Sequence, residues 1–154
     1  AVCNTPVSLL DLSKTIANHF GTDIEGANGI KSLKEIAAEP ADTNRVIFSE
    51  YHAAGAVAGG YMIRKGRWKY NYYVGFPSEL FDLDVDPEEL TDLAADPAFS
   101  DILADMDSAL RKICDPEATD ALAFADQADL IERYGGREAA LKLGAPGATP
   151  PPRV

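Results

Sequence analysis

The spacing of hydrophobic residues over positions 45–85 most restricts the fold of this chain, because it repeats every second residue. Residues 46–51 (VIFSEY) suit a strand. The stretch 59–75 (GGYMIRKGRWKYNYYVG) suits a hairpin that turns at Lys65-Gly66. Short strands joined by tight connections predict an antiparallel sheet. In the second arm of the hairpin, one face is predicted to carry Trp68, Tyr70 and Tyr72, and the other Lys69, Asn71 and Tyr73.

A fourth strand is predicted where hydrophobic and acidic residues alternate after the hairpin. Phe81, Leu83 and Val85 alternate with Asp82 and Asp84. Successive side chains of a strand point to opposite faces of the sheet. The three apolar side chains are therefore expected to face the core, and the two acids to face outward.

The acidic residues continue through 86–92, and this run raises the possibility of a calcium loop. An EF-hand loop that begins at Asp82 needs Gly at its sixth position and Glu at its twelfth. Those positions are Pro87 and Leu93, so the sequence argues against this site. Asp86-Pro87 instead ends the strand, since proline lacks an amide donor. Glu88 and Glu89 are then expected to open a short helical turn, where negative charge is favoured.

On both sides of the sheet the hydrophobic period is helical. Thr5-Pro6 is predicted to begin a helix over 6–20, and a short helix is expected over 32–39. After Pro97, an apolar stripe wide enough to cover one face of the sheet predicts a long helix. The stripe consists of Ile102, Leu103, Met106, Ala109, Leu110 and Ile113.

The C-terminal third of the chain is predicted to be helical up to a Pro-rich tail. Helices are expected over 117–134 and 137–143, and the tail from 144 (GAPGATPPPRV) cannot be helical. The predicted class is therefore α+β. A small four-stranded antiparallel sheet packs against a long C-terminal helix, with an N-terminal helix and further C-terminal helices.

The acidic balance of the chain argues against two classes of partner. Its formal net charge is -11 and its sequence pI is about 4.5. Nucleic-acid backbones and anionic membranes attract proteins through Lys and Arg, so neither is an expected partner. The sequence contains neither a run of about 18 apolar residues nor a recognisable signal peptide. A cytoplasmic location is therefore expected.

Few residues are candidates for a functional site. His52 follows a predicted strand and precedes a loop of small residues over 53–60, which would let a ligand approach the backbone. We therefore assign His52 as a contact for a bound group. His19 suits the C-terminal end of the first helix and is interpreted as structural. Cys3 and Cys114 have no metal-site spacing and are expected to be buried free thiols.

A basic cluster surrounds the tip of the predicted hairpin. Its members are Arg64, Lys65, Arg67 and Lys69. The cluster either binds an anion or pairs with the acids that follow it, and the sequence leaves both interpretations open. For catalysis the sequence offers no nucleophile that can be assigned to His52 and no further histidine near it for a metal site.

The order of several motifs resembles the C-terminal part of the sulfatases, within the alkaline-phosphatase superfamily. The motifs are TPVSLLDLSKTI, GIKSL, SEYH, MIRKGRWKYNYYVG and ELFDLDVDPEELTDLA. The last is the most specific: the family pattern is Glu-Leu-Tyr/Phe-Asp-Leu, a short gap, Asp-Pro-x-Glu and Asn-Leu. Here Asp92 replaces the usual Asn. The resemblance covers 5–95 well, and the remainder looks like the extended tail of some bacterial sulfatase-like hydrolases.

The resemblance implies a sulfuric ester hydrolase, although the catalytic centre would lie elsewhere. The family converts the Cys or Ser of a Cys/Ser-x-Pro-x-Arg motif to formylglycine, and CNTPV at 3–7 lacks the arginine and has its proline one place late. Formylglycine and a divalent metal, calcium or manganese, are thus implied for the parent enzyme. No cofactor, catalytic residue or metal ligand is assigned to this chain. Sulfate, phosphate and phosphonate esters all stay open as substrates.

The resemblance also implies an organisation and a partner. Residues 1–44 would belong to the parent catalytic domain, 45–114 would form the sheet-and-helix subdomain, and 115–154 a helical extension. The partner would be the N-terminal catalytic part of the sulfatase, against which this chain walls the substrate pocket. Alone, the chain is expected to be inactive, to expose apolar surface and to self-associate. The alternative is a stand-alone interaction or oligomerisation module derived from the same subdomain.

Overall fold

The computed structural model describes residues 2–26, 29–52 and 56–143. The chain divides into two compact units, Ala1–Pro116 and Glu117–Val154, and the sheet lies in the first. The domain boundaries predicted after residues 44 and 114 stay predictions.

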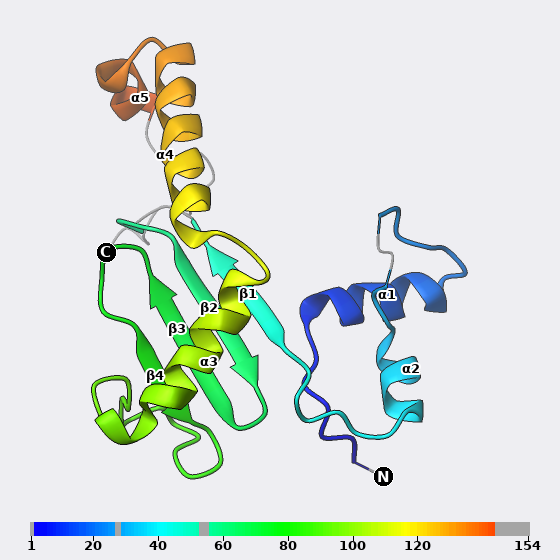
Figure 1. The fold of residues 1–154 in the computed structure, drawn as a ribbon. Helices are drawn as coiled ribbons and strands as arrows, with labels where there is room; N and C mark the ends of the chain where they lie inside the picture. The colour runs from blue at the N-terminus through cyan, green and yellow to red at the C-terminus, as the bar shows by residue number, and fades with distance from the viewer. Residues whose placement is uncertain (1, 27–28, 53–55, 144–154) are drawn as a thin grey trace, which may run out of the picture. The chain divides into compact units, whose positions relative to one another are not determined.

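Four strands form one antiparallel sheet, in the order β1-β2-β3-β4 (Figure 1). The strands are β1 (Ile47–Tyr51), β2 (Gly60–Lys65), β3 (Trp68–Tyr73) and β4 (Glu79–Asp82). The hairpin between β2 and β3 turns at Gly66, whose φ of 59° suits a glycine. Each strand pairs with its neighbour in sequence, so the predicted antiparallel sheet and the α+β class are confirmed.

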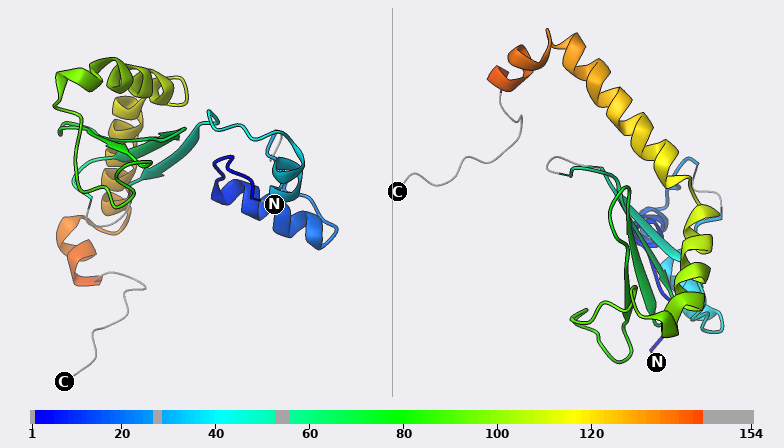
Figure 2. Two further views of the ribbon diagram at one scale, coloured as in Figure 1. Left: turned by 90° about the horizontal axis from the view of Figure 1, so that it is seen from below. Right: turned by 60° about the vertical axis from the view of Figure 1, so that its left-hand side comes forward.

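The hydrophobic core lies between the sheet and α3 (Ser100–Arg111), which packs on one face (Figure 2, right). Met106 and Leu110 of this helix are 1% and 0% exposed. They belong to one cluster with Ile63 of β2 and Leu80 of β4. The helix predicted to cover the sheet is thereby confirmed. Ile113, the last residue of the predicted stripe, lies beyond the helix and is exposed.

The face predicted for the fourth strand is wrong. Leu80 faces the core, and Asp82 on the same side of β4 is only 6% exposed. Arg67 donates to both carboxylate oxygens of Asp82, through Nε at 2.5 Å and through Nη2. This ion pair is what makes a buried acid tolerable at that position. The strand ends there, and Val85 lies exposed in the following turn.

Two helices precede the sheet, α1 (Leu9–His19) and α2 (Leu33–Ala38). The start predicted at Thr5-Pro6 is wrong, because Ser8 caps α1. The Ser8 amide donates to Asp11 Oδ2 at 2.7 Å, as in a capping box. The Thr5 hydroxyl instead accepts a hydrogen bond from the Asp42 amide at 2.9 Å. It therefore anchors the segment before the helix rather than the helix itself.

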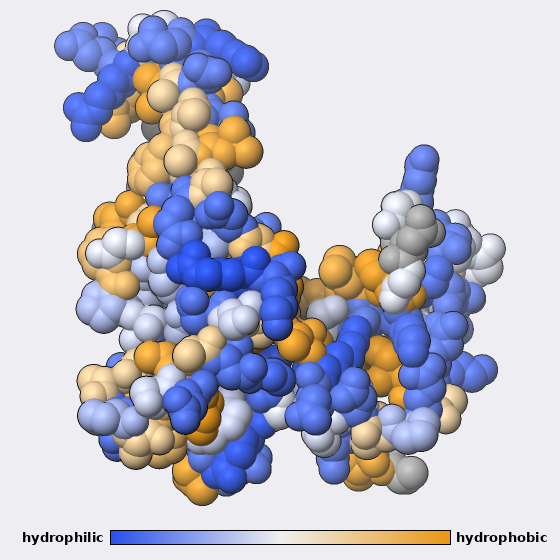
Figure 3. Space-filling model, in the orientation of Figure 1, coloured by the Kyte–Doolittle hydropathy of each residue, from blue (hydrophilic) through white to orange (hydrophobic). Residues whose placement is uncertain are grey.

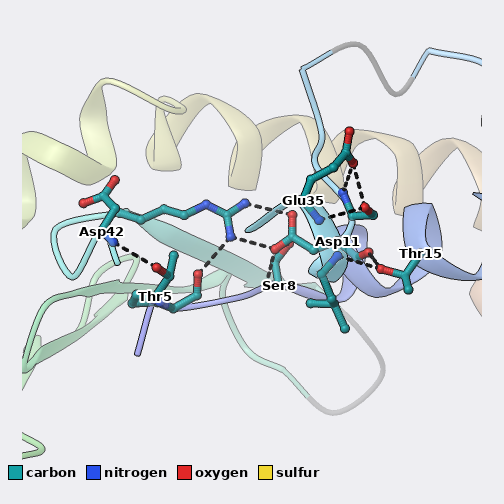
Figure 4. A network of polar contacts seen from close by, with 10 residues as sticks. Thr5, Ser8, Asp11, Thr15, Glu35 and Asp42 are labelled. Atoms are coloured by element: carbon teal, nitrogen blue, oxygen red, sulfur yellow. Dashed lines mark hydrogen bonds and ion pairs between the residues drawn. The ribbon is translucent and has the colours of Figure 1, made fainter. Parts of the chain in front are cut away.

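A partly buried ion pair joins α1 to the segment that leads into β1 (Figure 4). Asp11 is 1% exposed, and Arg45 donates to its two oxygens through Nη1 at 2.7 Å and Nη2 at 2.8 Å. Arg45 Nη1 also donates to the Pro6 carbonyl at 2.8 Å. The hydrogen bonds from Arg45 lower the pKa of Asp11 below its ordinary value. The charge of Asp11 is thus stabilised although it is out of water.

The second unit is helical, as predicted. It contains α4 (Pro116–Arg133), which begins at the last residue of the first unit, and α5 (Arg137–Leu143). Apolar side chains lie along the visible surface of α4 (Figure 3). None of the helices in the described ranges combines the length and the apolar character that crossing a membrane would require. The predicted Pro-rich tail, 144–154, lies outside the described residues.

Candidate functional site

His52 lies one residue beyond β1 on the side of the sheet that faces α3. Its side chain is 23% exposed, and its ring meets the Tyr61 ring edge-on with 5.4 Å between centroids. His52 Nε2 lies 3.7 Å from a carboxylate oxygen of Glu50, too far for a hydrogen bond. This nitrogen is buried and has no hydrogen-bond partner among the described residues. It is therefore a polar atom for which a bound group would supply a partner.

The rest of the predicted site falls partly outside the described residues. Of the loop 53–60, residues 53–55 are not described, so the predicted contact between this loop and a ligand stays a prediction. The role of His52 stays a prediction as well. His19, interpreted as structural, is the last residue of α1, and its ring lies edge-on to that of Phe20 with 5.3 Å between centroids.

A groove of about 560 Å³ lies on the sheet face opposite α3, which we call the open face. Its apolar and small lining residues include Ser49, Tyr51, Val57, Met62, Tyr73 and Phe76. His52 is not among the lining residues, so the structure does not bring the predicted contact to this groove. Strand alternation identified which residues share the open face. It did not indicate that Phe76, from the loop after β3, would extend it.

The basic cluster at the hairpin is largely paired with acids. Lys65 Nζ lies 2.5 Å from Asp105, and Lys69 Nζ lies 2.5 Å from Glu89. Arg67 holds Asp82, as described above. The fourth member, Arg64, is exposed. Of the two interpretations left open by the sequence, the structure favours pairing with the acids.

The acids after the fourth strand shape its turn. Asp86 Oδ2 accepts a hydrogen bond from the Thr91 amide at 2.8 Å. Asp92 Oδ1 accepts from the amides of Leu80 at 3.0 Å and Ala94 at 2.9 Å. Glu89 has a positive φ of 57° within a turn, so the helical turn predicted here is wrong. Asp86 and Asp92 thus hold the backbone of the segment that follows β4.

Asp82 is the buried member of this acidic run, and its charge depends on Arg67. The hydrogen bonds from Arg67 lower the pKa of Asp82 below its ordinary value. Across the described ranges, no group of three or more His, Cys, Asp or Glu side chains is placed to hold a metal ion. Asp82 therefore serves the fold through its ion pair with Arg67.

The two cysteines differ from their prediction in one respect. Cys3 is exposed rather than buried, whereas Cys114 is half-buried beside the core. Neither forms a disulfide. A side-chain hydrogen bond with Thr5 lowers the pKa of the Cys3 thiol. Cys3 lies in an irregular segment ahead of α1, where no core element covers it.

Comparison with known proteins gives a consistent family. The chain is 33% identical over 118 residues to arylsulfatase K of Danio rerio, a match that covers 71% of this chain and 22% of that protein. It is 35% identical over 97 residues to choline-sulfatase of Rhizobium meliloti, which covers 60% of this chain and 19% of the relative. This chain is a sulfatase relative. No family model matches it.

Solved structures also relate the chain to the sulfatases. A putative sulfatase from Bacteroides thetaiotaomicron superposes with a TM-score of 0.53 at 30% identity. The match covers 64% of this chain and 22% of that one. The chain thus spans about a fifth of the length of the sulfatases that it matches. These matches fit a sulfatase C-terminal subdomain, and the resemblance stated from the motifs is confirmed.

Proposed function

We propose that this chain is the C-terminal part of a sulfuric ester hydrolase. In this proposal the chain forms one side of the substrate pocket, and the nucleophile and the metal ligands come from the N-terminal catalytic part. One observation carries the proposal: sulfatase similarity covers most of this chain but only about a fifth of each relative. The substrate is a sulfate ester, because the matched relatives are named as sulfatases.

The residues of this chain do not fit the divalent metal and formylglycine that the family implies. The sequence has no Cys/Ser-x-Pro-x-Arg motif. Among the described residues, the acids of the 82–92 run bind backbone amides and cationic side chains, and no metal-binding cluster is formed. Hydrolysis of a sulfate ester needs groups that stabilise charge developing at the reacting centre. In the proposal this chain supplies support to those groups and performs no step of the reaction.

The isolated chain is accordingly expected to be inactive. Purified residues 1–154, incubated with a chromogenic aryl sulfate and with manganese or calcium, should give no turnover above the buffer. A longer polypeptide that includes a Cys/Ser-x-Pro-x-Arg motif upstream should turn over the same ester. Metal-dependent turnover by the isolated chain would disprove the proposal, as would a longer polypeptide that carries the motif and is inactive.

Within the longer enzyme we assign His52 the role of a substrate contact. The buried Nε2 without a hydrogen-bond partner supports this assignment. His52→Gln should raise KM about 5-fold, or about 1 kcal/mol, and change kcat less than about 2-fold. His19→Gln, at the exposed last residue of α1, is the matched control and should leave both constants unchanged. Equal kinetics for both variants would remove His52 from the site.

A second candidate function is an interaction or oligomerisation module, and α4 favours it. Of the residues of α4, only Pro116 is buried. Large apolar side chains of the helix are exposed, namely Leu122, Phe124, Leu130 and Ile131. A helix with so little burial gains its stability from a partner. The coding sequence upstream decides between the two functions, because a Cys/Ser-x-Pro-x-Arg motif there requires the hydrolase.

Self-association and the cytoplasmic location both stay predictions. Self-association of the isolated chain is expected on either function, since both leave apolar surface uncovered.

A further inference from the structure

On the open face, large apolar side chains around the groove are exposed, although Ile47 and Phe81 on the same face are buried. A sheet buries an apolar face against another element, and here α3 does so on one side only. On the opposite side Tyr51, Phe76 and Val57 are 56%, 54% and 75% exposed and line the groove. Aromatic side chains concentrated in a groove are typical of the centre of a protein interface.

The groove also has a defined electrostatic character. Glu79 lies in its lining, and its Oε2 accepts hydrogen bonds from Asn71 Nδ2 at 3.0 Å and from the Tyr73 hydroxyl at 3.1 Å. Glu50 is a second carboxylate in the lining, and the described lining residues include neither lysine nor arginine. A carboxylate that is covered by a partner needs a cation from that partner, since burying it alone is costly. An occupant of the groove must therefore be apolar and carry a basic residue beside Glu79.

We infer that the open face docks an apolar segment, with a lysine or arginine at its rim, from the remaining part of the sulfatase polypeptide. The inference rests on the proposed function. The source follows from length, because the matched sulfatases contain about four-fifths of their chain outside the part matched here. A second copy of this chain is the weaker occupant, because each copy has a net charge of -11 and the two would repel.

Thiol labelling of matched cysteine variants tests the inference. Ser49→Cys places a thiol on the open face, and Ser108→Cys places one at an exposed position of α3. Each variant is made in the 154-residue chain and in the longer sulfatase polypeptide, and maleimide labelling is followed site by site by mass spectrometry. In the longer polypeptide the Ser49→Cys thiol should label at least about 10-fold more slowly than in the isolated chain. The Ser108→Cys thiol should label within about 2-fold of its rate in the isolated chain.

Each other result overturns the inference. Equal labelling of Ser49→Cys in both polypeptides would leave the open face uncovered, and protection of Ser108→Cys would place the docking elsewhere. Protection of Ser49→Cys in the longer polypeptide that rises with the concentration of that polypeptide would identify a second copy as the occupant. The proposed function is tested separately. A longer polypeptide that protects Ser49→Cys but cleaves no sulfate ester would support the docking surface and disprove the proposed function.

The lysine or arginine inferred for the occupant is tested by adding a second substitution to the Ser49→Cys variant. Glu79→Gln removes the carboxylate and leaves the amide able to meet Asn71 and Tyr73. In the longer polypeptide, this change should speed labelling of Ser49→Cys at least about 3-fold, because the occupant's cation loses its partner. An unchanged rate would show that the occupant brings no basic residue to Glu79.

Discussion

Replacing Leu80 by alanine is expected to lower the free energy of unfolding by about 3 kcal/mol. Leu80 is 0% exposed and lies in the cluster that α3 forms with the sheet. Truncation would remove apolar contacts and leave a cavity, which the neighbouring strand and helix cannot easily fill. The loss should appear as a lower urea midpoint with an unchanged slope.

Val85→Ala is the matched control, because this residue is 74% exposed in the turn after β4. The control should change the free energy of unfolding by less than about 0.5 kcal/mol. The two variants together distinguish the observed strand from the sequence prediction, in which Val85 faced the core. A larger loss from Val85→Ala than from Leu80→Ala would contradict the face assigned to β4.

The error at β4 shows what alternation can and cannot predict. The alternation located the strand correctly, because hydrophobic residues at every second position are typical of a strand with one face buried. The stretch 80–85 contains two such series, and Leu80 and Phe81 begin them on opposite faces. Choosing between the series required knowledge that Arg67 reaches Asp82 across the sheet. A contact between residues fifteen apart leaves no mark in the local pattern.

The start of the first helix was mispredicted for a related reason. Thr5-Pro6 and Ser8 with Asp11 are both good helix starts by local chemistry. Tertiary contacts decide between them, since Thr5 is held by Asp42 and Asp11 is held by Arg45. The candidate site was less predictable still. The sequence identified His52 from its place after a strand, but it could not show that its ring packs edge-on against Tyr61 and is not part of the groove lining.

Replacing Arg45 by methionine is expected to lower the free energy of unfolding by about 3 kcal/mol. Arg45 donates to both oxygens of Asp11 and to the Pro6 carbonyl, and methionine keeps most of the side-chain volume without these donors. The loss is large because it leaves the Asp11 carboxylate buried without its cation. Lys31→Met is the control, since its ion pair with Glu39 is about half exposed on both sides. It should cost less than about 0.5 kcal/mol.

The pH dependence of the same variant separates a charge effect from lost packing. The folded pKa of Asp11 is lowered, chiefly by hydrogen bonds from Arg45. Its contribution to stability is therefore present above the unfolded pKa of about 3.9 and is lost as the pH falls through the folded value. Urea unfolding at pH 7 and near pH 3 should show the gap between wild type and Arg45→Met narrowing in acid. A gap that stays constant would mean that Arg45 stabilises the chain through its packing, and that the buried charge of Asp11 does not depend on it.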